Sequence, residues 1–300
     1  QHLNFNAGAF LNYANNQLIL SHNDPQIGSQ SLARHILRAD VVAALGLYDV
    51  FNLEFAMPTA LYQDGDDLVS LGRSGESIEG VSAGDLRVTP KLRLLDRRSF
   101  GGFGLALASP VYIPTGDTAT MQSEGNLRVE AKLIADWTHP WGFALMGNIG
   151  YQVRRRTLVQ NLEIDDVVRW SVAGAIPLGM PSMTAYVIGF GDLSAGEVLD
   201  PESRTPTDGL RTASPTELLS GLRYRSPWQL EVSAGAGVGF LRGLGSPDVR
   251  GTLGLHWLPE FTPDTALRPV QDLGIRWYRA LFVSAQPLGA SPTHGRRCRD

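Results

Sequence analysis

The chain has a single cysteine and no long apolar run, and each absence excludes a class of structure. Cys298 has no partner for an internal disulfide and cannot take part in a multi-cysteine metal site. The run VVAALGL at residues 41–47 is among the longest apolar stretches, and it is far shorter than the roughly eighteen residues that a membrane-spanning helix requires. We therefore expect no disulfide, no metal centre, no cofactor and no transmembrane helix.

Positive charge is too scarce for a protein that binds nucleic acid. The 300 residues include 26 Lys and Arg against 30 Asp and Glu, which gives a formal net charge of −4. Neutralising a phosphate backbone requires a clustered cationic surface. Outside the predicted strands and turns, the one dense basic run lies in the tail, at Arg296, Arg297 and Arg299. We expect no nucleic-acid partner.

Glycine, by contrast, is abundant, with 33 residues, and it takes part in a strict alternation. In WQLEVSAGAGVGF, residues 228–240, every second residue from Trp228 to Phe240 is apolar, and the residues between them are polar or glycine. Similar alternation runs through residues 84–95, 126–138 and 247–258, where the charged side chains keep to one face. A period of two is typical of β-strands whose two faces meet different environments.

Applied along the chain, this pattern predicts twelve strands, at residues 4–14, 33–47, 51–63, 84–95, 101–114, 126–138, 141–154, 166–177, 182–191, 215–225, 228–240 and 247–258. The links between them alternate in length. Links after even-numbered strands are tight, such as HP at 139–140 and SP at 226–227. Links after odd-numbered strands include long polar segments, such as residues 191–213.

These features together predict an all-β fold: a twelve-stranded antiparallel transmembrane β-barrel over residues 1–258, with short periplasmic turns and long extracellular loops. Such a barrel belongs in a bacterial outer membrane. Residues 259–300 would be a periplasmic tail, with a short amphipathic helix at 272–285 or no fixed structure. The chain begins at Gln1 rather than Met, as an exported protein does after its signal peptide is removed.

Tryptophan positions agree with this topology. Trp137, Trp141, Trp228 and Trp257 all fall at strand ends beside tight turns, where an aromatic girdle at the periplasmic membrane interface is expected. A soluble β-sandwich or lipocalin-like barrel would show the same alternation with its apolar face turned inward. The strand lengths and the end-placed tryptophans favour the membrane barrel.

Residues 84–117, GDLRVTPKLRLLDRRSFGGFGLALASPVYIPTGD, resemble the outer-membrane barrels of the MetA-pathway of phenol degradation family. The likeness lies in Gly84-Asp85, in Pro90-Lys91 with the Leu/Arg alternation that follows, and in residues 114–117, PTGD. The layout of residues 1–258 is also similar to the N-terminal barrels of OmpA-family proteins from myxobacteria. Those barrels usually continue into an aspartate-rich linker and a peptidoglycan-binding domain, and residues 259–300 resemble neither.

The inward face is the candidate functional surface, and it is rich in charge. The predicted lumen-lining cations are Arg38, Arg87, Lys91, Arg93, Arg128, Lys132, Arg154, Arg169, Arg223, Arg225 and Arg250, and the predicted anions are Asp40, Glu54, Glu130, Asp136, Glu217 and Glu231. Two interpretations stay open. The charges pair across neighbouring strands and fill the lumen, or the excess of cations biases a narrow aqueous path toward anions.

Catalysis is not expected. A phospholipase on such a barrel needs a serine and a histidine together on the lipid-facing surface. None of the barrel's histidines falls in a clear outward position beside a serine; they are His2, His22, His35, His139 and His256. The glycines of residues 235–239 lack phosphate-loop spacing. DGDD at 64–67 lacks the spacing of a known calcium loop, so a solvated acidic loop is the simpler explanation.

The predicted function is passive: a narrow channel or small-solute uptake porin with a cation-rich lumen. The alternative is a structural or interaction barrel with a closed lumen, as part of an envelope assembly. The predicted partners are the lipid bilayer and lipopolysaccharide, which the acidic long loops would engage through divalent ions. An envelope protein bound through the loops or the tail is a further possible partner.

Overall fold

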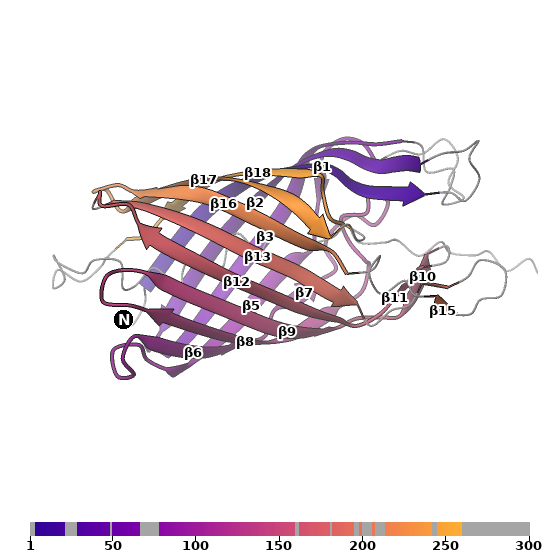
Figure 1. The fold of residues 1–300 in the computed structure, drawn as a ribbon. Coiled ribbons are helices and arrows are strands. Elements are labelled where there is room, and N and C mark those ends of the chain that lie inside the picture. Colours follow the sequence, from indigo (N-terminus) through magenta and orange to yellow (C-terminus); the bar gives the residue numbers. More distant parts are fainter. Residues whose placement is uncertain are drawn as a thin grey trace, which may run out of the picture.

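The computed structural model describes residues 4–21, 29–48, 50–66, 78–159, 162–180, 182–194, 198–199, 206–207, 214–241 and 245–259. Strands joined by turns and loops make up this part of the chain (Figure 1). No helix among the residues described is long and apolar enough to cross a membrane. Residues 260–300, for which a tail was predicted, lie outside the described residues.

The strands form a closed antiparallel barrel. A 14-stranded sheet follows the order β4-β3-β2-β1-β18-β17-β16-β13-β12-β9-β8-β6-β5-β7, and further pairings of β3 with β5 and of β8 with β7 complete the ring. Its strands are β1 (Asn4–Ser21), β2 (Ser29–Leu47), β3 (Phe51–Asp64), β4 (Ser82–Ala83), β5 (Leu86–Leu95), β6 (Phe103–Ala108), β7 (Val111–Ile113), β8 (Arg128–Thr138), β9 (Ala144–Val153), β12 (Val167–Pro177), β13 (Met183–Ser194), β16 (Thr216–Arg225), β17 (Leu230–Leu241) and β18 (Val249–Trp257).

Two of the barrel's twelve positions are each shared by a pair of strands. β4 leads into β5 along β3, and β6 leads into β7 between β5 and β8. The second interruption falls at Ser109-Pro110, where proline has no N–H to give to the ladder. The barrel confirms the predicted twelve-stranded fold, although the predicted strand 101–114 is split in two at this proline.

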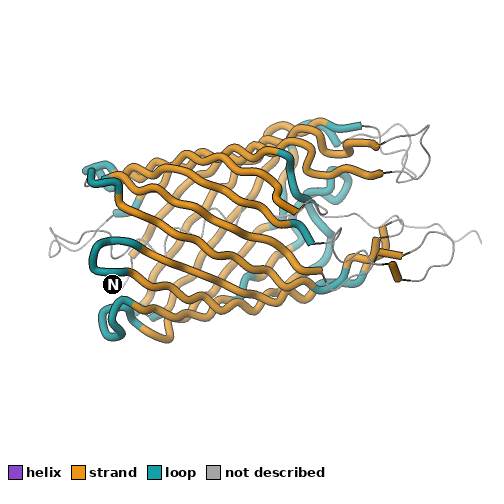
Figure 2. The backbone as a smooth tube through the Cα atoms, in the orientation of Figure 1, coloured by secondary structure: helices purple, strands orange, loops and turns teal. Residues whose placement is uncertain are grey.

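The first and last strands close the ring. β1 pairs with β18 from Ala7↔Trp257 to Asn15↔Val249. The N-terminal end of β1 lies at the end of the barrel that carries the tight turns, on the left in Figures 1 and 2. In outer-membrane barrels the short turns face the periplasm, which makes the opposite end extracellular.

The two faces of each strand differ as the alternation predicts. In β8, Arg128, Glu130 and Asp136 are buried inside the barrel, while Leu133 is 41% exposed on the outside. Exposed Leu, Val, Ile and aromatic side chains recur on the outward face of the other strands. An apolar surface of this extent is stable only against lipid or a partner. The polar face therefore lines the interior.

Beyond the membrane wall, the structure departs from the predicted links. β1 and β2 have 18 and 19 residues and project past the barrel as a hairpin. A second, four-stranded sheet stands at the same end, built from β10 (Thr157–Val159), β11 (Leu162–Ile164), β14 (Val198–Leu199) and β15 (Pro206–Thr207). The prediction of loops at these residues was wrong. Outside the bilayer both faces of a strand meet water, so the contrast between faces fades.

Aromatic side chains gather at the short-turn end. Trp137 on β8 packs edge-on against Phe143, with ring centroids 6.5 Å apart, and Trp257 on β18 packs in the same way against Phe5, also at 6.5 Å. Trp141 and Trp228 lie in the adjoining tight turns and are exposed. All four tryptophans assigned to the girdle therefore lie at one end of the barrel.

Candidate functional site: the inner wall of the barrel

Of the charged residues predicted to line the lumen, all but Arg93 are buried or partly buried, and all but Arg154, which follows β9, lie on strands of the ring. The most deeply buried are Asp40 and Glu130, both 0% exposed, and Arg250, 2% exposed. Arg38, Lys91, Arg128, Asp136, Glu217, Arg223 and Glu231 are also buried, and Glu54, Arg87, Lys132, Arg154, Arg169 and Arg225 are partly buried. Arg93 differs from the rest: its side chain is 39% exposed at the short-turn end and contacts Asp96 at 3.2 Å.

One ionic cluster surrounds Tyr112 on β7. The Arg169 guanidinium donates to the Tyr112 hydroxyl (3.0 Å), which donates to Glu130 Oε2 (3.2 Å). Lys132 Nζ lies 2.8 Å from Glu130 Oε1. The Arg128 guanidinium stands over the Tyr112 ring, 4.8 Å from its centroid, which is cation–π geometry. This cluster brings together predicted residues from β8 and β12 through a tyrosine that the charge pattern had not indicated.

A second cluster joins β18, β16 and β1. Arg250 donates from Nε to Glu217 Oε2 (2.6 Å) and from Nη2 to Glu217 Oε1 (2.9 Å). Its Nη1 donates to Asn12 Oδ1 (2.8 Å). A bidentate pair of this kind fixes both side chains against the wall. Elsewhere, Arg223 lies 3.8 Å from Glu231 on the adjacent strand.

Besides Asp96, three further carboxylates in contact with the predicted arginines were missed by the sequence analysis. Asp85 accepts from Arg128 (2.7 Å), Glu124 also accepts from Arg128 (3.0 Å), and Asp192 lies 3.5 Å from Arg169. They reduce the predicted excess of positive charge. Asp85 has the same phase as Arg87 within the predicted strand 84–95, so the alternation carried a signal for it that was overlooked. Asp192 lies in β13, one residue beyond the predicted end of that strand, and Glu124 lies between strands, where no alternation exists.

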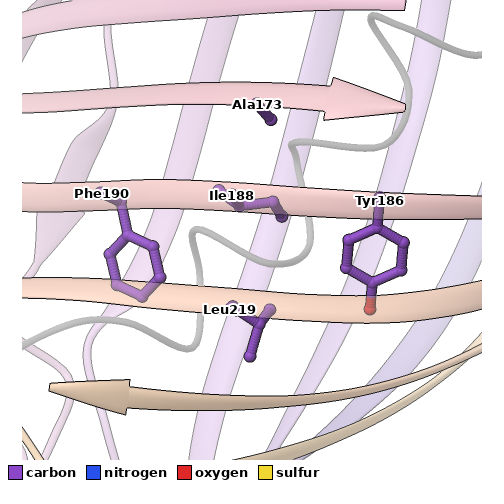
Figure 3. Close-up of a cluster of buried hydrophobic side chains, with 5 residues drawn as sticks. All are labelled: Ala173, Tyr186, Ile188, Phe190 and Leu219. Carbon is purple, nitrogen blue, oxygen red and sulfur yellow. The ribbon is translucent and has the colours of Figure 1, made fainter. Parts of the chain in front are cut away.

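One part of the inner wall is apolar. Tyr186, Ile188 and Phe190 on β13 and Leu219 on β16 form a buried cluster with Ala173 on β12, as Figure 3 shows. The inward face of β13 is therefore largely apolar. Tyr186 also explains glycines on the polar side of the strands nearby. A Cβ at Gly221 or Gly235 would stand 2.4 or 2.7 Å from the Tyr186 hydroxyl.

The described histidines hydrogen-bond to groups other than serine. His35 contacts the Tyr13 hydroxyl (2.8 Å) and the Asn15 amide (3.4 Å), and His256 contacts Asn6 Oδ1 (3.1 Å). His139 lies in the tight turn between β8 and β9, edge-on to Trp137 and Trp141. His2 and His22 lie outside the described residues.

The predicted acidic loop at 64–67 is described as far as Asp66. Asp66 Oδ2 accepts from the backbone N–H of Ser31 (2.8 Å), and its other oxygen pairs with Arg34. These contacts tie the loop to β2. Among the described residues, no group of three or more His, Cys, Asp or Glu side chains is arranged to hold a metal ion.

Comparison with solved structures defines the kind of barrel. An outer-membrane channel from Pseudomonas putida F1 matches with a TM-score of 0.60 and 14% sequence identity, over 86% of this chain and 96% of that one. The chain has the fold of an outer-membrane β-barrel. The NanC porin matches with a TM-score of 0.51 and 10% identity, over 83% of this chain and 97% of that one.

No protein-family model and no curated protein matches the chain. At these identities, the likeness to the two solved structures extends to the fold. Together with the apolar exterior, this fold places the chain in a bacterial outer membrane. The resemblance of residues 84–117 to the phenol-degradation barrels stays a prediction.

Proposed function

We propose that the chain is a narrow outer-membrane channel for small polar solutes. The observation that carries the proposal is the inner wall itself, on which charged and amide side chains face inward while the exposed apolar side chains face outward. A water-filled path needs such a wall. The two solved barrels that it resembles are described as a channel and a porin. Lipopolysaccharide and an envelope protein remain proposed partners of the long loops, and no catalytic step forms part of the proposal.

The alternative is a barrel that is closed by its own ion pairs and serves as a structural or interaction element. The buried pairs support it in part. The Arg250–Glu217 pair, however, joins strands separated by one other strand, and the Arg223–Glu231 pair joins adjacent strands. Pairs of this kind run along the wall rather than across the axis. Twelve strands also enclose more space than the eight-stranded barrels that side chains can fill.

The channel proposal includes a weak preference for anions. Its test is planar-bilayer recording in a KCl gradient, where the reversal potential reports the selectivity. Replacing Arg87, Lys91 and Arg93 together by glutamate should move the reversal potential toward cation preference, because the local field along β5 changes sign. The matched control replaces Arg87 and Arg93 by lysine, which keeps the charges and should keep the wild-type selectivity.

Two results would count against the proposal. A correctly folded wild-type protein that is silent at all voltages would favour the structural alternative. A conducting protein whose selectivity is the same in the glutamate and lysine variants would show that β5 does not line the conducting path.

A further inference from the structure

The segment between β7 and β8, residues 114–126, is held inside the extracellular end of the barrel; we call it the mouth strap. Its first part is tied to the barrel wall. The Gly116 N–H donates to Asp85 Oδ1 (3.2 Å), and the Asp117 N–H donates to the carbonyl of Ala83 (3.0 Å). Thr120 shares a hydroxyl–hydroxyl hydrogen bond of 2.5 Å with Ser82 at β4. The strap therefore follows the inner wall rather than standing away from the rim.

Further along, the strap contacts β3 and β2, the next two strands around the ring from β4. The side-chain amide of Gln122 donates to Gln63 Oε1 on β3 (3.0 Å), and its carbonyl oxygen accepts from Arg38 Nη2 on β2 (3.2 Å). Gln63 is 2% exposed and Arg38 is 5% exposed, so both partners are inward-facing and buried. Gln122 thus links the strap to two strands beyond the one at which it is anchored.

Two residues later, the strap contacts another part of the ring. Glu124 Oε1 accepts from Arg128 Nη1 on β8 (3.0 Å) and lies 3.5 Å from Arg154 Nη1, just after β9. From β2 to β9 is five positions around a ring of twelve. Gln122 and Glu124 are two residues apart in sequence, yet their contacts lie on strands five positions apart around the ring. We infer that the strap crosses the lumen between these strands.

The backbone of the crossing is compact and enclosed. Ser123, between the two contact residues, is 1% exposed, and Met121 is 4% exposed. Met121 has a φ of 58°, a left-handed conformation that costs a non-glycine residue free energy and persists where the surroundings impose it. Strained, buried backbone of this kind is typical of a segment whose position matters to function.

We propose that the mouth strap is the constriction of the channel, and that the contact of Gln122 with Gln63 and Arg38 is what limits the size of solute that passes. The inference rests on the proposed channel function. Two amide groups and one guanidinium meet at this contact, so the solutes admitted there are small, hydrogen-bonding molecules rather than bulky or apolar ones. The charges of β5 would then act on solutes that the strap has already selected by size.

The test compares unitary conductance among single-residue variants. Gln122→Ala and Gln63→Ala remove the same hydrogen bond from its two sides, and each should raise the conductance roughly twofold or more by widening the narrowest section. The conductance of the double variant should be only slightly higher than that of the better-conducting single variant, because all three variants lose the same Gln122–Gln63 hydrogen bond. Polyethylene glycols too large to enter the wild-type pore should enter the variants.

The matched control is Asn148→Ala. Asn148 also presents an inward amide, but it donates to Ser171 (2.6 Å) on the wall formed by β9 and β12, away from the strap. The conductance and the polymer size cut-off of the Asn148→Ala variant should equal those of the wild type. Heat-modifiable migration on gels shows that each variant is folded, which separates a wider pore from a damaged barrel.

The possible outcomes distinguish the two proposals. If the wild type conducts and Gln122→Ala and Gln63→Ala match it, the strap is not the constriction and the channel proposal stands. If the wild type is silent and the strap variants conduct, the strap is confirmed as the constriction. If every folded variant is silent, the channel proposal fails and the inference fails with it.

Discussion

At the scale of single residues, the stability of the wall depends on keeping both partners of each buried ion pair. Arg250 and Glu217 are 2% and 5% exposed, and two hydrogen bonds join them. Folding removes each charge from water, and the attraction between the two partners offsets this desolvation cost only while both are present. Removing one partner leaves the other buried and uncompensated.

We therefore predict that Arg250→Ala lowers the free energy of unfolding by about 3–5 kcal/mol, as for other broken buried pairs. Arg93→Ala is the control. The Arg93–Asp96 pair is 39% and 40% exposed, and exposed pairs contribute only about 0–1 kcal/mol. Urea titration of the two variants refolded in lipid vesicles gives both values. Equal losses would show that burial does not set the strength of these pairs.

The sequence predicted which face each of these charges occupies, but not its partner. Alternation assigned Arg250 and Glu217 to the interior, because a period of two depends on neighbours along one strand. Their pairing depends on the registers of β16, β17 and β18, which single-strand patterns do not contain. Tyr112 was missed for a related reason: an aromatic residue on the inward face carries no charge to mark it.

At the scale of elements, the connections between strands are held by specific hydrogen bonds of their own. The loop before β12 is an example. Asp166 accepts hydrogen bonds from the Tyr151 hydroxyl and from the Arg154 N–H (3.0 Å). These two bonds hold the pKa of the Asp166 carboxyl below its ordinary value.

A depressed pKa predicts how this connection responds to acid. Its contribution to stability should be complete above the ordinary aspartate pKa of about 3.9 and should be lost as the pH falls through the lower, folded value. Carbon-13 NMR of the carboxyl group measures the folded pKa directly. Tyr151→Phe removes the first hydrogen bond and should raise the pKa of Asp166 toward the ordinary range. An unchanged value would mean that the tyrosine has no part in the shift.

Element boundaries were predictable where lipid makes the two faces differ. The predicted ranges for β8, β12 and β16 agree with the structure to within two residues. β1 was predicted to end at residue 14 and continues to Ser21. A register shift follows Asn15, and Asn16 has a φ of 52°, so the alternation changes phase there. The mouth strap has no alternation at all, and its path depends on contacts with distant strands.

At the scale of the whole molecule, the barrel's orientation in the membrane can be measured. The four tryptophans at the short-turn end should lie at headgroup depth. In a Trp170→Phe/Trp277→Phe variant, only these four remain of the six. Their fluorescence should be quenched more strongly by lipids brominated near the headgroup than by lipids brominated near the end of the acyl chain. Stronger quenching by the deeper label would contradict the predicted girdle.

The pairing of β1 with β18 has a consequence for biogenesis. Residues near position 10 find their hydrogen-bond partners near position 254, so nearly the whole chain must be made before the ring can close. Until then, two unpaired strand edges are exposed, and edges of this kind recruit foreign strands. Maturation is therefore limited by the arrival of the C-terminal strand, and a protein truncated before residue 249 is a candidate for aggregation rather than for insertion as a smaller barrel.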